Sequence, residues 1–117
     1  MTVFDAGMKG DTHILRRQKE RHRHSLEQVE GEGAPRVILL EQDPTVMGCA
    51  PDAHIHLTSP LASRHHAILR PRGTDCTIFD NDSDNGVFLN GVKVNSAVLR
   101  DGDVIQVADS IFVYSEG

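Results

Sequence analysis

The chain has few cysteines and no long hydrophobic run, and both absences limit what it can be. Its 117 residues include only Cys49 and Cys76, too few for a disulfide framework and too far apart for a zinc knuckle. No apolar run approaches the roughly 18 to 20 residues of a membrane span, and the N-terminus lacks the apolar stretch of a signal peptide. We therefore expect reduced cysteines, with Cys76 in the core, in a cytoplasmic protein.

Charge is unevenly distributed along the chain. Residues 1–24 carry six Lys and Arg against three Asp and Glu, so their net charge is +3 and that of the remainder is −8. A chain with a basic end and an acidic body lacks the basic face that a nucleic-acid-binding domain needs. Residues 1–20, with few large apolar side chains, are expected to form a flexible tail, a short helix from Asp11 being the alternative. Residues 21–117 suit one domain.

Short apolar segments separated by turn residues make up the body of the chain. Turn signals recur about every 8 to 12 residues without a long amphipathic helix between them, which predicts an all-β fold, an antiparallel β-sandwich. Asn90-Gly91, between two apolar segments, is the strongest short hairpin signal that a sequence offers. Strands are expected at residues 26–29, 37–40, 45–47, 54–57, 66–69, 76–79, 87–89, 92–94, 104–107 and 111–114.

Three loop motifs follow one another in a fixed order between these segments. They are Gly48-Cys49 after one strand, Ser63-Arg64-His65-His66 at the start of a later one, and Ser83-Asp84-Asn85-Gly86 before another. In this order and spacing, with a late turn at residues 99–105, the sequence resembles the forkhead-associated (FHA) domain family over about residues 24–115. The family pattern is a Gly-Arg pair, then Ser-x-x-His, then Ser-x-Asn-Gly before an aromatic-containing strand.

The resemblance implies a β-sandwich whose loops at one end bind phosphothreonine peptides, without catalysis, a cofactor or a metal ion. Carried over by position, Ser63 would donate its hydroxyl to the phosphate, and Arg64 beside it would supply positive charge. Asn85 would bond the main chain of the peptide. Structural support of the loops would come from Gly48, His66 and Gly86.

Two positions of this site depart from the family pattern. Cys49 stands where the family has the arginine of its Gly-Arg pair, and Asp84 stands where it more often has Thr. Loss of a hydrogen bond to a charged group costs about 1.5 to 3 kcal/mol, and a carboxylate close to the phosphate repels it. We therefore expect a degraded phosphate pocket, which Arg70 or Arg72 would assist if their loop bends over it.

The same residues allow other interpretations. Ser63 and His66 suggest a nucleophile and its base, yet the sequence places no carboxylate to orient the histidine and shows no oxyanion loop. His54 and His56 share one face of a predicted strand, but no third ligand is spaced for a metal ion. Cys49, near Arg64, is the candidate for a reactive thiol. We favour a bracing histidine, a solvated strand face and an inert cysteine.

We expect a non-catalytic signalling module that recognises phosphothreonine-containing protein segments. The alternative is a phosphate-independent interaction or self-association module on the same fold. The partner would be another phosphorylated protein or the chain's own N-terminal tail, in which the candidate phosphoacceptor Thr12 is followed by Ile14 and Leu15. Neither nucleic acid nor a membrane is an expected partner. The domain would be the front part of a longer regulatory protein.

Overall fold

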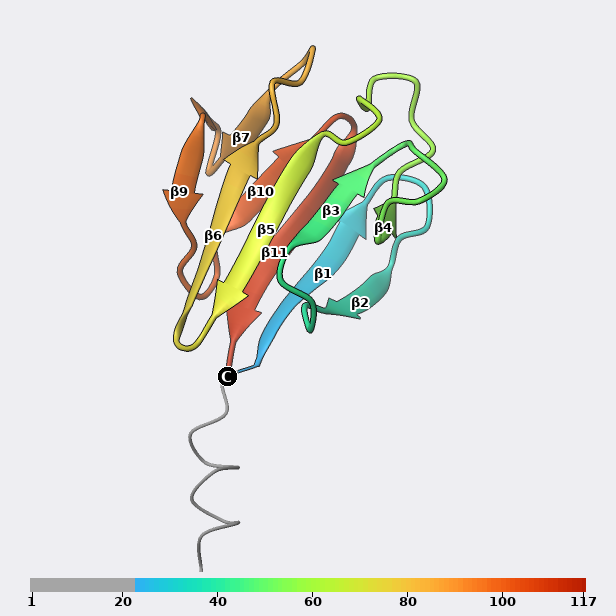
Figure 1. Cartoon of the computed structure of the whole chain (residues 1–117). Helices are drawn as coiled ribbons and strands as arrows, with labels where there is room; N and C mark the ends of the chain where they lie inside the picture. Colours follow the sequence, from blue (N-terminus) through green and yellow to red (C-terminus); the bar gives the residue numbers. More distant parts are fainter. Residues whose placement is uncertain (1–22) are drawn as a thin grey trace, which may run out of the picture.

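Two β-sheets face each other across one core in the computed structural model, which describes residues 23–117. The described residues form eleven strands and no helix (Figure 1). This confirms the predicted all-β sandwich. The expected tail, residues 1–20 with Thr12, lies outside the described residues.

One sheet has six strands and the other has five. In the order of hydrogen-bonded neighbours, the six-stranded sheet contains β2 (Arg36–Leu39), β1 (His24–Glu30), β11 (Ser110–Glu116), β10 (Val104–Val107), β7 (Val87–Leu89) and β8 (Val92–Val94). The five-stranded sheet contains β4 (Ile55–His56), β3 (Thr45–Gly48), β5 (Ala67–Arg72), β6 (Asp75–Asp80) and β9 (Ser96–Val98).

The structure departs from the expected strands in the five-stranded sheet. β9 was not predicted, because its three residues show no pattern that marks a strand without the neighbouring β6. β4 has two residues rather than four, and it pairs parallel to β3, through Met47 and Ile55 and through Gly48 and His56. All other strand pairs are antiparallel.

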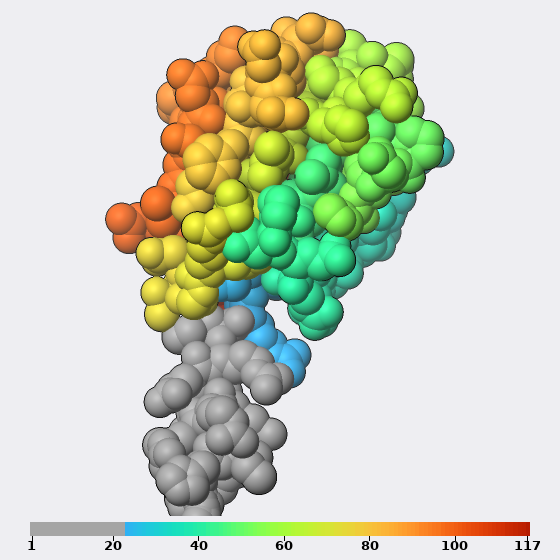
Figure 2. Space-filling model, viewed as in Figure 1, coloured from blue at the N-terminus to red at the C-terminus, as the bar shows by residue number. Residues whose placement is uncertain are grey.

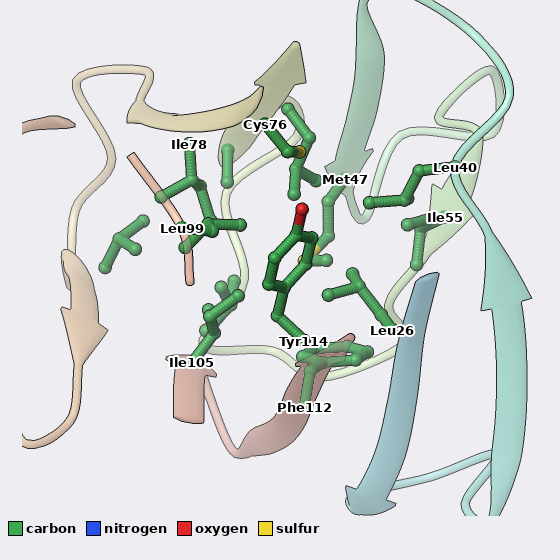
Figure 3. Packing of buried hydrophobic residues seen from close by; sticks show 14 of the residues in the cluster. Leu26, Leu40, Met47, Ile55, Cys76, Ile78, Leu99, Ile105, Phe112 and Tyr114 are labelled. Carbon is green, nitrogen blue, oxygen red and sulfur yellow. The ribbon is translucent and has the colours of Figure 1, made fainter. Parts of the chain in front are cut away.

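The core consists of apolar side chains that the two sheets direct toward each other. Tyr114 of β11 lies at its centre, and Figure 3 shows Leu26 of β1 and Met47 of β3 beside it. Cys76 of β6 is fully buried, as predicted, and burial raises the pKa of its thiol to about 12. An inward side chain at every second position is what half-buried strands require.

The alternation and the hairpin turn predicted from the sequence are both confirmed. Ile55 and Leu57 are buried, whereas the two histidines of the segment are exposed. Asn90 and Gly91 adopt φ values of 51° and 85° and join Leu89 directly to Val92. Two consecutive residues with positive φ are what a type I′ hairpin needs.

The loops that carry the three motifs lie at one end of the sandwich. Residues 49–54 join β3 to β4, residues 57–66 join β4 to β5, and residues 81–86 join β6 to β7. Figure 1 shows these loops at the top, whereas β1 begins and β11 ends at the opposite end. There the Gly117 amide donates to the Arg23 carbonyl at 2.9 Å. The first described residues therefore enter the sandwich far from the motif loops.

Candidate functional site

The first two motif loops are joined through their backbones. The amides of Cys49 and Ala50 donate to the carbonyls of Ser63 and Arg64, each at 3.0 Å. Gly48 precedes this contact, and a Cβ at that position would collide with both carbonyls. Glycine is needed here because the Ser63 loop packs directly onto the backbone at the end of β3.

His66 joins the second loop to the third. Its side chain is fully buried, its Nδ1 accepts from the Ser63 amide at 3.0 Å, and its Nε2 donates to the Gly86 carbonyl at 2.8 Å. Both ring nitrogens are therefore occupied by backbone groups, and neither is left to take a proton from the Ser63 hydroxyl. This geometry matches a bracing residue and not the base of a catalytic pair.

The third loop is held by hydrogen bonds of its own and by contacts with the second. The Gly86 amide donates to Ser83 Oγ at 2.8 Å, and the Asp84 amide donates to Ser63 Oγ at 3.1 Å. Asn81 Nδ2 donates to the His65 carbonyl at 2.9 Å. Figure 2 shows residues near 60–65 (yellow-green) and near 80–86 (orange-yellow) side by side at the same end of the molecule.

Ser63 and Asn85 keep part of their hydrogen-bonding capacity for a ligand. Because Ser63 Oγ accepts from Asp84, its own O–H remains able to donate. Asn85 is exposed, and its Nδ2 donates to the Leu61 carbonyl at 2.8 Å. Its side-chain oxygen has no partner among the described residues. The loops thus present a hydroxyl donor and an amide acceptor at the same end of the sandwich.

Charged side chains of both signs lie in the same loops as Ser63 and Asn85. Arg64 is exposed, and His65 Nε2 lies 3.1 Å from Asp52 Oδ1. The hydrogen bond from His65, aided by the charge of Arg64, lowers the pKa of Asp52 below its ordinary value. Asp84 is a second exposed carboxylate in the third loop. The sequence does not indicate the Asp52–His65 pair, because no motif links two exposed residues thirteen positions apart.

Cys49 packs against the core, and the two arginines of β5 bind an aspartate outside the site. Cys49 is half-buried, packs against the hydrophobic core, and accepts a hydrogen bond from His56 at its backbone carbonyl. Arg70 and Arg72 each donate through Nε to Asp43 at 2.7 Å. Neither arginine reaches the site, because both bind Asp43 near the end of β5 that lies away from the motif loops (Figure 1).

The described residues hold neither a cluster of metal ligands nor a membrane-spanning helix. Residues 23–117 contain no group of three or more His, Cys, Asp or Glu side chains placed to hold a metal ion. In the same part of the chain, no helix has the length and apolar character needed to cross a membrane.

The chain is similar to known proteins in sequence and in fold. Residues 45–108, just over half of the chain, match the family described as FHA domain. An ABC transporter ATP-binding/permease protein of Mycobacterium tuberculosis is 44% identical over 71 residues, which are 61% of this chain and 8% of that protein. The glycogen accumulation regulator GarA of Mycolicibacterium smegmatis is 37% identical over 87 residues, 74% of this chain and 55% of that protein.

A solved structure supports the same assignment. It comes from a structural and functional analysis of phosphothreonine-dependent FHA domain interactions, and it matches with a TM-score of 0.73 and 28% identity, covering 80% of this chain and 95% of that one. The two curated relatives are longer than this chain, which spans 8% of one and 55% of the other. The shared fold, the matched residues and the ordered motifs lead to one conclusion: the chain belongs to the FHA domain family.

Proposed function

We propose that this domain recognises phosphothreonine-containing protein segments through the three motif loops. The observation that carries the proposal is the set of contacts through His66 and Ser63, which fixes the three loops relative to one another before any ligand binds. A preorganised site loses less free energy in ordering its side chains on binding. The analysis that produced the related structure concerned phosphothreonine-dependent interactions of FHA domains.

In this proposal each loop residue has a separate task. The Ser63 hydroxyl and the Arg64 guanidinium donate charge-assisted hydrogen bonds to the phosphate. Asn85, next to them, bonds the main chain of an extended peptide through its side-chain amide. His66, Gly48 and Gly86 touch no ligand, and they hold the loops in place.

We expect this site to bind phosphate less tightly than a site with the full family pattern. Cys49 brings no guanidinium group, the Asp52 carboxylate lies within reach of the Arg64 charge, and Asp84 adds an exposed carboxylate to the third loop. A missing hydrogen bond to a charged phosphate corresponds to about 1.5 to 3 kcal/mol, or roughly ten- to a hundredfold in affinity. The same features favour the second candidate, a phosphate-independent interaction module on this fold. We propose further that the partner is another phosphorylated protein or the chain's own tail, phosphorylated at Thr12.

Calorimetric titration with matched phosphorylated and unphosphorylated threonine peptides separates the two candidates. We expect binding that depends on the phosphate, weakened roughly tenfold or more by Arg64→Ala and strengthened by Cys49→Arg. Arg100→Ala is the matched control, because Arg100 is also exposed but lies in the β9–β10 connection. Equal affinity for both peptides, or equal loss in the Arg64 and Arg100 variants, would reject phosphate recognition at these loops.

A further inference from the structure

The edge of the six-stranded sheet formed by β2 is open. β2 pairs with β1 on one side, and no other strand of the described residues pairs with it. An open edge presents unpaired backbone groups on which another chain can add a strand, and natural proteins commonly protect such edges with charged residues, prolines or bulges.

The register of β1 and β2 identifies the free backbone groups. The Leu40 amide donates to the His24 carbonyl at 2.8 Å, and Ile38 lies opposite Leu26 two residues further along. Bonded and non-bonded pairs alternate in an antiparallel ladder, so Ile38 bonds to β1 as Leu40 does. The N–H and C=O groups of Val37 and Leu39 consequently point away from β1, toward the open edge.

The side chains of this edge are apolar and unprotected. Val37 is 68% exposed and Leu39 is 49% exposed, both on the outer face of the sheet. The one charged residue of the strand, Arg36, does not guard the edge, since its Nε donates to Gln28 Oε1 at 2.6 Å and its Nη2 to the His56 carbonyl at 3.3 Å. β2 contains no proline, and its pairing with β1 has no bulge.

We propose that β2 pairs antiparallel with β2 of a second copy of this chain, about a twofold axis through Ile38. In that register Val37 of each copy lies opposite Leu39 of the other, and each such pair exchanges two hydrogen bonds. Every backbone group that β2 leaves free is then bonded. The exposed Val37 and Leu39 side chains of both copies meet on one face. The edge is self-complementary, as an isologous dimer interface must be.

The other edges fit a second copy less well. In β9, the bonds from the Asp80 amide to Asn95 and from the Leu99 amide to Cys76 leave Ser96 and Val98 directed outward. Because Ser96 is polar, two paired β9 edges would lack the apolar cluster that Val37 and Leu39 form at β2. β8 carries Lys93 in the middle of its three residues. β4, the remaining edge strand, has only two residues. β2 is thus the edge whose backbone and side chains both favour self-pairing.

The proposed dimer leaves the motif loops accessible and requires no phosphate. It is independent of the proposed function, and it would place two loop sites on one particle, which raises the apparent affinity for a partner phosphorylated twice. Because β2 has four residues, the added interface is small, and a weak, concentration-dependent dimer is expected.

The test is sedimentation equilibrium of the full chain at concentrations from about 10 μM to about 1 mM. We expect a dimer at the upper concentrations, together with slower amide exchange at Val37 and Leu39. Val37→Pro removes an outward N–H without breaking a bond to β1, and Val37→Lys places a charge opposite Leu39 of the second copy. Both variants should stay monomeric, and both should bind a phosphothreonine peptide as the parent chain does. Val98→Lys, the matched control on the β9 edge, should dimerise like the parent.

Three results would overturn the proposal. They are a monomer at every concentration, undiminished dimerisation of a folded Val37→Lys variant, and loss of the dimer in Val98→Lys. Thermal unfolding of each variant establishes that it is folded, so that Val37→Lys decides the question if Val37→Pro is unstable. Loss of phosphopeptide binding in the parent chain would reject the proposed function without touching the dimer.

Discussion

At the scale of single residues, His66 has the largest structural task in the site. Its imidazole is fully buried between backbone groups of two loops. His66→Ala would leave the Ser63 amide and the Gly86 carbonyl without their partner, at about 1 to 3 kcal/mol. We expect the melting temperature to fall by several degrees, measured by thermal unfolding.

The control for this substitution is His54→Ala. His54 is exposed and accepts one hydrogen bond, from the Val46 amide. Its removal should cost less, because water replaces the lost partner. Similar losses in the two variants would contradict the bracing role of His66.

Gly48 is a second residue on which the site depends. Gly48→Ala would push a Cβ into the Ser63 and Arg64 carbonyls, and overpacking of this kind costs about 1 to 3 kcal/mol. We expect lower stability and displaced amide NMR signals for both loop residues. Gly73→Ala is the comparison, since a Cβ there meets no atom but requires a φ of +59°. It should reduce stability while leaving the Ser63 and Arg64 signals in place.

At the scale of elements, an ion-pair cluster ties the β2–β3 connection to β5. Asp43 accepts from Arg70 and Arg72, and these hydrogen bonds lower its pKa below the ordinary value of 3.8. A carboxyl group whose pKa is lower in the folded state stabilises the fold at pH values above its pKa in the unfolded state. That stability is lost as the pH falls through its pKa in the folded state. Asp43→Asn should therefore be slightly less stable than the parent at pH 7.

Urea unfolding measures this effect at two pH values. The gap between the parent and Asp43→Asn should narrow as the pH falls below 3.8, and it should close once the pH passes below the lowered pKa of folded Asp43. Asp109→Asn is the control, because the exposed Asp109 has no hydrogen-bond partner among the described residues. A gap that stays constant with pH would show that the ion pairs do not stabilise the fold, which is a common result for exposed pairs.

At the scale of the whole molecule, the first described residue, Arg23, lies at the end away from the motif loops (Figure 1). Ten residues lie between Thr12 and Arg23, and a flexible chain of that length spans roughly 16 to 19 Å. β1 has seven residues and rises about 23 Å along the sandwich. Phosphorylated Thr12 would thus reach the motif loops of its own chain only when the intervening residues are well extended. The motif loops of a second molecule would therefore compete effectively for phosphorylated Thr12.

Thr12-phosphorylated protein tests this prediction by NMR. We expect the amide signals of Ser63, Arg64 and Asn85 to move relative to the unmodified chain. A perturbation that grows with concentration indicates binding between molecules, and one that does not indicates binding within the chain. Signals that move only near Thr12 would exclude the tail as a ligand.

Local patterns in the sequence were sufficient for the fold class and the hairpin. Alternating apolar residues predicted which side chains face the core, because the period of a strand is fixed by its geometry. Asn90-Gly91 predicted its turn, since few other residues accept two positive φ values in succession. The order of the loop motifs indicated the family before any contact was known. These properties depend on neighbours within a few positions of the chain.

Only the tertiary structure decided the properties that depend on distant partners. His66 and Gly86 are twenty positions apart, and Asp52 and His65 are thirteen apart. Arg70 and Arg72 bind Asp43 rather than the site, which their own sequence context does not indicate. The open edge of β2 likewise follows from the strand order of the sheet. The physical reason is that a side chain's partner, and a strand's free edge, are set by how separate segments pack, and no local pattern records that packing.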